Sequence, residues 1–236
     1  MKYIRYLCLS LMLSIFLLSV PVRAFALNVG LEIDLFSNDE AKRTEDFLAI
    51  ELLLEVPPKK PLSCFAVNSN HMIAIGHSEW LKHIVCVYNA SGEFQYGYRF
   101  NSDGGSFYVD WDEENVVVYL LRCDEAIEMD ANGKVLNVAE VLDTADNSDY
   151  RYEHLIPNKK TVGDIQYYGK NEGLSPISSD YAMLVAKDPY GKEIVIYDAS
   201  AEKRSIGIYY AIGTMAFFGV AIVFSLRNMH KKGHTK

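Results

Sequence analysis

The sequence has 236 residues, with 23 Lys and Arg against 31 Asp and Glu, and its formal net charge is −8. The charges are segregated along the chain. The first 26 residues carry three bases and no acid, the last ten carry four bases and no acid, and residues 27–204 carry 16 bases and all 31 acids. This distribution excludes a uniformly charged cytosolic protein and a basic nucleic-acid-binding protein.

The N-terminal segment has the layout of a secretory signal peptide. Met1–Arg5 is basic, Leu7–Val20 is an apolar run, and Ala24-Phe25-Ala26 supplies the small residues that signal peptidase recognises. We expect cleavage after Ala26, which makes residues 1–26 a signal peptide. The alternative is an uncleaved N-terminal helix, because Arg23 lies close to the cleavage site.

A second uncharged segment, Ser205–Leu226, predicts a transmembrane helix. Its 22 residues would rise about 33 Å as a helix, against a hydrocarbon core of about 30 Å. The basic residues 227–236 predict a cytoplasmic tail, so residues 27–204 are expected outside the cytoplasm, anchored to the lipid bilayer of the cell membrane. Gly207 and Ala211 form a small-xxx-small pair, a candidate contact with a membrane protein partner.

The first element expected in the exterior segment is a helix over Asn38–Glu55. Ser37 and Glu40 form a capping box, apolar residues recur at helical spacing, and Pro57-Pro58 would end the helix. The run Ile50–Val56 is equally compatible with a strand.

From Leu62 onward the pattern changes to short apolar runs separated by turns. Asn-Gly and related pairs after an apolar run favour hairpins, because Gly and Asn tolerate positive φ. The expected strands are Phe65–Val67, Met72–Ile75, Ile84–Tyr88, Phe94–Tyr98, Phe107–Val109, Val116–Leu121, Ala126–Met129 and Val135–Val138.

Two of the turns, Asn89–Gly92 and Asp130–Gly133, are 41 residues apart. Four-stranded units that recur every ~40 residues are typical of propeller blades. On these residues the sequence resembles the β-propeller superfamily, with blade-like units at about Ser63–Asn101 and Ser106–Leu142. The resemblance implies a mainly β domain built from antiparallel meander repeats, as a partial or open propeller.

A third similar segment is Ile194–Ser200, which follows a turn at Asp188–Gly191. It lies 68 residues beyond the second unit, measured from Asp130 to Asp198, and Ala201 stands where the turn glycine is expected. Either an open stack of small sheets or another β architecture with the same hairpins fits this spacing. The order of signal, repeats and anchor also resembles that of small single-pass membrane proteins of bacteria, which implies no activity.

Three histidines at regular spacing raise the question of a metal site. His71, His77 and His83 are six residues apart, with Glu79 among them. A zinc site needs three or four ligands that converge on one point, and no close-spaced ligand pair is present. We therefore expect solvated loop histidines rather than a metal centre.

The densest group of acids follows the strand at Phe107–Val109. Asp110, Asp112, Glu113 and Glu114 could supply oxygen ligands to calcium, but an EF-hand loop would need Gly and Glu where the chain has Asn115 and Leu121. We expect an acidic turn instead. The same turn carries Trp111, which we expect to be an exposed aromatic and a candidate partner contact.

The remaining chemistry-bearing residues give no catalytic signature. Cys64 and Cys86 fall on the first and third strands of one unit, too far apart for a disulfide, and we expect Cys86 to be a buried free thiol. Serine-hydrolase and phosphate-binding motifs are absent from the sequence. No cofactor is indicated.

Taken together, these features predict a membrane-anchored extracytoplasmic interaction or sensory module that is not an enzyme. Two alternatives stay open. One is an accessory subunit of a membrane complex, and the other is an envelope enzyme that uses a carboxylate pair or the histidine cluster.

Overall fold

The computed structural model describes residues 27, 29–79, 81–171, 180–205, 207–209 and 213–217. The predicted signal peptide and cytoplasmic tail lie outside the described residues, as does most of the predicted anchor at 205–226. Among the residues that are described, no helix combines the length and the apolar character needed to cross a membrane.

The described chain is mainly β, with 14 strands in three antiparallel sheets, as the sequence predicts. Sheet I has the order β2 (Glu51–Leu53), β6 (Phe94–Asn101), β5 (Lys82–Tyr88), β4 (Ile73–Ser78), β3 (Cys64–Val67). Sheet II has the order β1 (Ile33–Leu35), β10 (Val135–Val141), β9 (Glu125–Met129), β8 (Asn115–Leu120), β7 (Phe107–Asp112). Sheet III has the order β11 (Lys159–Val162), β12 (Ile165–Lys170), β13 (Met183–Lys187), β14 (Glu193–Asp198).

Each sheet contains a meander of four consecutive strands, and the N-terminal segment adds a fifth strand to two of them. β1 pairs with β10 at the edge of sheet II, and β2 pairs with β6 at the edge of sheet I. The helix α2 (Asn38–Leu48) connects these two added strands. The three meanders do not form a closed propeller in the described part of the chain.

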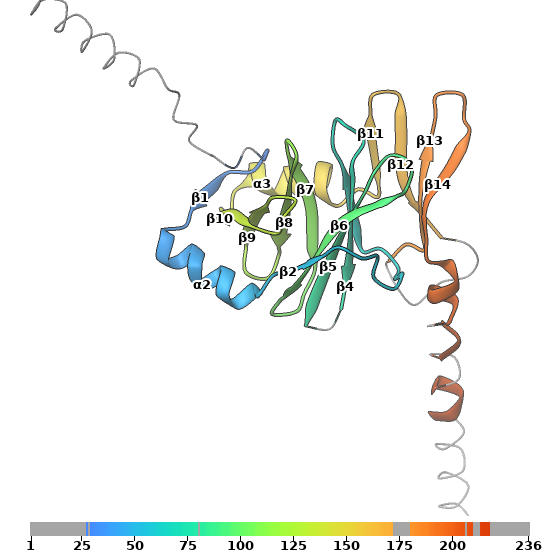
Figure 1. Ribbon diagram of the computed structural model, residues 1–236, viewed down its shortest axis with the longest axis horizontal. Helices are drawn as coiled ribbons and strands as arrows, with labels where there is room; N and C mark the ends of the chain where they lie inside the picture. The colour runs from blue at the N-terminus through green and yellow to red at the C-terminus, as the bar shows by residue number, and fades with distance from the viewer. Residues whose placement is uncertain are drawn as a thin grey trace, which may run out of the picture.

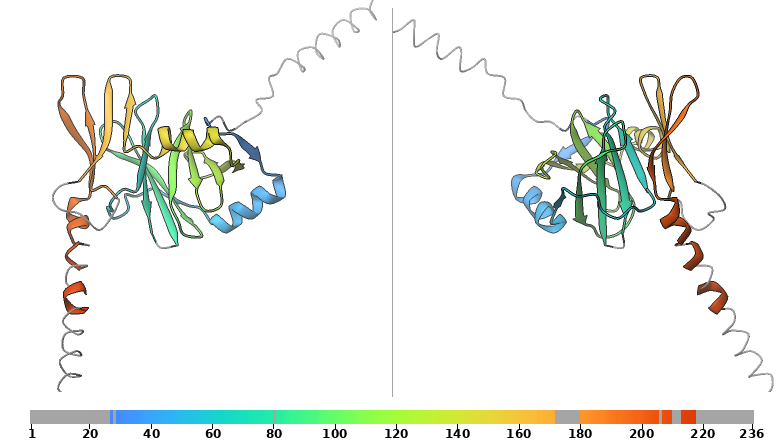
Figure 2. Two further views of the ribbon diagram at one scale, coloured as in Figure 1. Left: turned by 180° about the vertical axis from the view of Figure 1, so that it is seen from behind. Right: turned by 45° about the vertical axis from the view of Figure 1, so that its right-hand side comes forward.

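Sheet I lies between the other two sheets (Figure 1). One buried cluster joins sheet I to sheet II through residues such as Val85 and Val118, and a second cluster joins sheet I to sheet III through residues such as Ile75 and Leu184. The two further views in Figure 2 show the same order. Alternate residues of one strand therefore supply two cores.

This double burial explains why the central strands are apolar without a break. In β5, Val85 and Val87 belong to the core shared with sheet II, whereas Ile84, Cys86 and Tyr88 belong to the core shared with sheet III. A strand buried on both faces is expected to read as a continuous apolar run rather than an alternating one.

The outer face of sheet II is covered by the segment that follows β10 and by the N-terminal segment of the described chain. The helix α3 (Ala145–Tyr150) is followed by the short π-helical segment η1 (Arg151–Leu155). Leu155 of η1 and Leu27, Val29 and Leu31 of the N-terminal segment form a buried cluster with apolar residues of sheet II. These segments cap one end of the stack.

The three meanders share one turn between their third and fourth strands. In each turn the first residue donates its N–H to the carbonyl of the fifth, at 2.9–3.0 Å, and its side-chain Oδ1 accepts two backbone N–H groups at 2.8–3.0 Å. The glycine has a φ of 79°, 79° or 89°. The turns are Asn89–Glu93, Asp130–Lys134 and Asp188–Lys192.

The position of the third unit corrects the sequence analysis. Asp188–Gly191 is itself the equivalent of the two earlier turns, so Ile194–Asp198 is a fourth strand rather than a third, and Ala201 does not replace a turn glycine. α3 and η1 stand between the second and third units and lengthen the spacing.

The predicted helix over Asn38–Glu55 is only partly confirmed. The capping box of Ser37 and Glu40 is present, with the Ser37 N–H donating to Glu40 Oε2 at 3.1 Å. The helix ends early because Ala49 adopts a left-handed conformation, with φ 44°. The residues Glu51–Leu53 then pair with β6 and form β2, so part of Ile50–Val56 is a strand, the alternative given in the sequence analysis.

Candidate interaction surface

The first two of the shared turns each lie against a neighbouring sheet. A Cβ at Gly92 in the turn of sheet I would lie 2.6 Å from the carbonyl oxygen of Ile196 in β14. At the turn of sheet II, Tyr98 of sheet I donates its hydroxyl to the carbonyl of Asp130 at 2.6 Å. Both turns therefore help to hold two sheets together.

The third turn has no such neighbour. A Cβ at Gly191 would find only the side chain of Lys187, from the same sheet, within 4 Å. The next side chain, Tyr190, is 93% exposed. A single exposed aromatic side chain is common on protein surfaces, and the feature that sets Tyr190 apart is its place in the one shared turn without a neighbouring sheet among the described residues.

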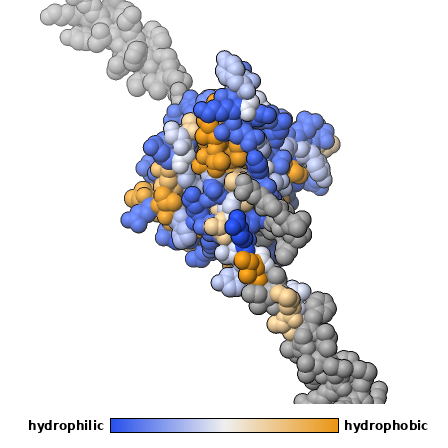
Figure 3. Space-filling view, turned by 90° about the vertical axis from the view of Figure 1, so that its right-hand side faces the viewer, coloured by the Kyte–Doolittle hydropathy of each residue, from blue (hydrophilic) through white to orange (hydrophobic). Residues whose placement is uncertain are grey.

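The outer face of sheet III is also uncovered by any described element of the other sheets. On this face Tyr168, Val185 and Val195 lie side by side in the strand register. Among the described residues, the small buried cluster on this side contains residues of sheet III and the adjoining Ala182 alone. Val195 is 52% exposed, and Figure 3 shows an apolar patch among polar residues on this side of the molecule. We call the outward-facing side of sheet III the open face.

The edge of sheet III differs from the corresponding edges of the other sheets. β6 and β10 are each covered by an added strand, β2 and β1. Among the described strands, none pairs with the other edge of β14. Ile194 and Val195 of β14 are half-exposed, so an apolar edge strand is presented to solvent, a feature that native proteins usually cover or blunt.

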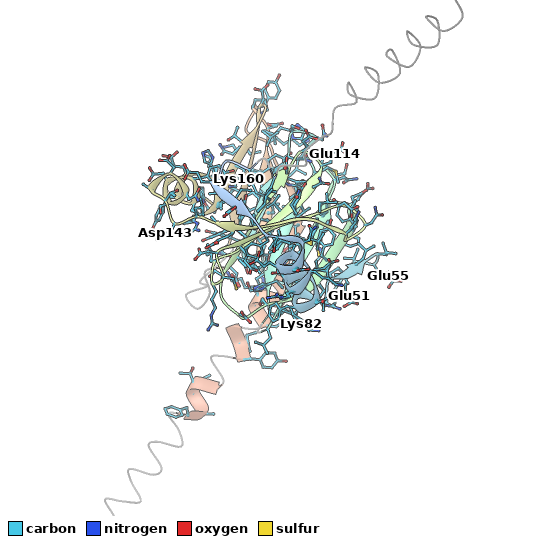
Figure 4. All side chains as sticks on the ribbon, turned by 90° about the vertical axis from the view of Figure 1, so that its left-hand side faces the viewer. Glu51, Glu55, Lys82, Glu114, Asp143 and Lys160 are labelled. Atoms are coloured by element: carbon cyan, nitrogen blue, oxygen red, sulfur yellow. The ribbon has the colours of Figure 1, made fainter. Side chains whose placement is uncertain are left out.

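Charge distinguishes sheet III from the rest of residues 27–204. Residues 27–158 contain 9 bases and 24 acids, whereas residues 159–204 contain 7 of each. The labelled acids Glu51, Glu55, Glu114 and Asp143 are all exposed and lie at the periphery of the molecule in the view of Figure 4. The open face is thus at the electrically neutral end of an acidic domain.

The open face has its own polar contacts. Glu193 accepts a hydrogen bond from the Tyr168 hydroxyl and another from Lys170 Nζ at 3.0 Å. These two donors lower the pKa of the Glu193 carboxyl. Lys159 and Lys187 lie beside the same row of residues in the strand register, so the apolar centre has a polar rim, as protein interfaces commonly do.

Below the open face, the chain continues directly toward the predicted anchor. Residues 200–205 are helical, and Lys203 in this helix is buried, with Nζ donating to Asn171 Oδ1 at 2.9 Å and to the Asp180 carbonyl. Burial lowers the pKa of Lys203. This buried cation fixes the helix against the residues that flank β12 and β13.

The three predicted histidines do not converge. His71 lies in the turn between β3 and β4, with Nδ1 2.9 Å from the Tyr167 hydroxyl. His77 packs against Tyr197 of sheet III, whereas His83 stacks on Phe107 of sheet II. Two of them therefore lie on opposite faces of sheet I.

His77 and His83 are buried, which corrects the expectation of solvated loop histidines. Burial lowers the pKa of both to about 4. His77 Nδ1 donates to the Pro61 carbonyl at 3.1 Å, and His83 Nδ1 has no hydrogen-bond partner among the described residues. Both act as neutral aromatic groups in the cores between sheets, and the described residues contain no group of three or more His, Cys, Asp or Glu arranged to hold a metal ion.

The predicted acidic turn is shorter than expected. Asp110 and Asp112 belong to β7, and only Glu113 and Glu114 form the turn, with Glu113 at a φ of 53°. Asp110 Oδ2 accepts the hydroxyl of Tyr150 at 2.9 Å. The Asp110 carboxylate therefore holds α3 against β7 through this hydrogen bond.

Trp111 is not the exposed aromatic that the sequence predicts. It is half-buried and packs on the core between sheets I and II, because alternate residues of β7 face that core. Its Nε1 is buried and has no hydrogen-bond partner among the described residues. The exposed aromatic of the molecule's open end is instead Tyr190, whose position after Asp188-Pro189 in a hairpin turn was its only sequence signal.

The cysteines behave as the sequence predicts. Cys64, Cys86 and Cys123 are free, and Cys86 is fully buried. Cys64 and Cys86 belong to the two different cores on either side of sheet I. Burial raises the pKa of both thiols to about 12, which disfavours the thiolate that a nucleophile requires.

One buried carboxylate was not identified from the sequence. Glu128 in β9 is 3% exposed, and its two oxygens accept the side-chain amides of Asn115 and Asn137 at 2.7 and 2.5 Å. The three residues lie on adjacent strands of sheet II. An acid within the short apolar run Ala126–Met129 was the only sequence signal, and Glu128 connects three strands through these hydrogen bonds.

Comparison with protein-family models and with curated proteins finds no match to this chain.

Proposed function

We propose that this protein is a membrane-anchored extracytoplasmic interaction module, and that residues 27–204 contact another protein through the open end of sheet III. The observation that carries this proposal is the contrast between the three shared turns. Two of them lie against a neighbouring sheet, whereas the third has no neighbour outside its own sheet and carries an exposed tyrosine, Tyr190, where the other two carry the exposed polar residues Ser91 and Asn132.

The fold that we infer for the module is an open stack of three blade-like units. The identical turn in all three meanders supports this interpretation, and so does the contact of each of the first two turns with the next sheet in the stack. In repeat proteins an end that lacks a cap exposes the surface that the next repeat would have covered. The open face of sheet III has this character.

The location that we propose is the outer surface of the cell membrane, with Ser205–Leu226 as the anchor. The helical residues 200–205 support this placement, because Lys203 holds them against sheet III immediately before the predicted span. Sheet III would thus be the sheet nearest to the membrane anchor and to a partner in the same membrane.

The three shared turns also provide the test. A photo-crosslinking amino acid is placed at position 190 in the full chain in its native membrane, and a matched control carries it at position 132, the equivalent position in the turn of sheet II. We expect a protein adduct from position 190 and none from position 132. Adducts from neither position, or equally from both, would contradict the proposed function.

A further inference from the structure

We propose that the groove between α2 and β10 binds an extended peptide segment that carries basic side chains. The peptide pairs with the free part of β10 as an added strand and lies against α2. This site belongs to sheet II and not to sheet III, so the inference goes beyond the proposed function and does not depend on it.

The groove is a hollow of about 390 Å³ between one helix and one strand. A volume of this size lies within the range of pockets that bind ligands, so the groove has room for a short stretch of peptide. One wall is formed by residues 135–138 of β10. The other wall is a single face of α2, whose residues recur at helical spacing: Asn38, Ala41, Lys42, Glu45 and Asp46.

The strand wall of the groove has an unpaired edge. β1 pairs with β10 at residues 139–141 only, and the Phe36 N–H then donates to the Val138 carbonyl at 3.0 Å. The chain leaves the edge at this point because Ser37 caps α2. No described strand pairs with residues 135–137 on this side. An extended peptide can hydrogen-bond to such an edge and so continue the line of β1.

The free part of β10 contains a β-bulge at Leu136, since the pairing with β9 passes from Val135 to Asn137. Bulges often protect an edge from pairing. This one belongs to the repeat instead, because Gln95 is bulged at the same place in β6. Gln95 is exposed, whereas Leu136 is half-buried and lines the groove. Leu136 therefore gives the peptide an apolar contact where the other sheet carries an amide.

The charges of the groove select the kind of peptide. Glu45 and Asp46 are exposed, and neither takes part in an ion pair with a described residue. Lys42 is the one base among the residues that line the groove, and residues 27–158 carry 24 acids against 9 bases. A peptide with lysine or arginine is therefore attracted to the groove, whereas an acidic peptide is repelled.

Selection from a peptide library tests the inference. Random heptapeptides displayed on phage are selected on the full chain in mild detergent. We expect enrichment of peptides in which lysine or arginine alternates with apolar residues, because the side chains of a strand point alternately to its two faces. A library that yields no enriched peptide would overturn the inference.

A matched pair of charge reversals places the enriched peptide in the groove. Asp46→Lys reverses a charge inside the groove, and Asp39→Lys makes the same change at an exposed position of α2 outside it. We expect Asp46→Lys to raise the dissociation constant of the synthetic peptide about fivefold or more, measured by fluorescence polarisation, and Asp39→Lys to leave it unchanged. An equal effect of both substitutions, or of neither, would show that the peptide binds elsewhere.

Methylation of the peptide backbone separates strand pairing from attraction between charges. Two versions of the enriched peptide carry N-methyl groups on alternate residues, in the two opposite phases. In one phase the methyl groups remove the N–H donors that face β10, and in the other they remove the N–H donors that face away from it. We expect one version to lose binding and the other to keep it. Equal binding of the two versions would overturn the added strand.

Discussion

Sheets II and III lie on opposite sides of sheet I, and they differ in what covers them. The fourth strand of sheet II is paired with β1, and its outer face is packed under η1 and the N-terminal segment. The fourth strand of sheet III has no described partner at its other edge, and its outer face carries the half-exposed Val195. The same four-stranded unit thus has a covered edge and a covered outer face in sheet II, whereas in sheet III no described strand pairs with its last strand.

The comparison shows that the segments added to the three meanders contact sheets I and II but not sheet III. β1, α2, β2, α3 and η1 all complete sheets I and II or the end that sheet II forms. None of them completes sheet III. The side chains of β13 that face outward, Met183 and Val185, are nevertheless buried, and the half-exposed apolar residues of this sheet lie on its edge strand β14.

The largest expected effect concerns pH, because a buried histidine lies at each of the two interfaces of sheet I. The pKa of His77 and of His83 is lowered from 6.5 to about 4. The unfolded chain therefore takes up protons at a higher pH than the folded chain, and stability falls as the pH drops from 6.5 toward 4. We expect a loss of about 3 kcal/mol between pH 6.5 and pH 5, measured by urea unfolding.

Separate substitutions assign this loss to the two interfaces. His83→Phe should remove the part that belongs to the interface with sheet II, and His77→Leu the part that belongs to the interface with sheet III. A pH profile that neither substitution changes would contradict the burial of these histidines.

The next effect compares a covered turn with the free one. Gly92→Ala places a Cβ 2.6 Å from a backbone carbonyl of β14 and strains a φ of 79°, whereas Gly191→Ala strains a φ of 89° without a close contact outside its own sheet. We expect losses of about 3 kcal/mol and about 1 kcal/mol respectively, measured by thermal or urea unfolding. Equal losses would show that the turn of sheet I does not hold sheet III.

A smaller effect is expected at the buried carboxylate of sheet II. Glu128→Gln replaces one of two acceptor oxygens by a donor, which leaves either the Asn115 or the Asn137 amide unpaired. We expect a loss of about 2 kcal/mol in the free energy of unfolding. Glu140→Gln on the exposed face of β10 is the control and should change it by less than ~0.5 kcal/mol.

The smallest effect is expected at the free turn itself. Tyr190 is 93% exposed, so Tyr190→Ser should change the free energy of unfolding by less than ~0.5 kcal/mol. A larger loss would mean that Tyr190 supports the fold, and the contrast between the covered and free turns would then no longer point to a partner.

Much of the fold could be predicted from local pattern. The strands β3 to β10 and the turns at Asn89–Gly92 and Asp130–Gly133 follow from apolar runs and turn residues, which act over a few neighbouring residues. The burial of Cys86 followed from its place in such a run. These features depend on the chain alone and not on which sheet packs against which.

Apart from the alignment of the third repeat, the errors concern residues whose environment is set by distant parts of the chain. Trp111 was expected to be exposed because it stands among acids, but β7 turns it toward the core shared with sheet I. Ile50–Val56 could not be assigned until β6 was available to pair with β2. The open face was not visible in the sequence, because β13 has the same apolar run as the covered strands.

The β-rich, acidic character of residues 27–204 and their repeated hairpins could be read from the amino-acid sequence, because turn chemistry, apolar runs and charge are local properties. It also predicts the signal and the anchor at the two ends. The middle position of sheet I, the cap of η1 and the N-terminal segment on sheet II, and the absence of a described partner strand beside β14 emerged from the packing of the sheets. These outcomes depend on which surfaces bury one another, and burial is a property of the assembled chain rather than of any one segment.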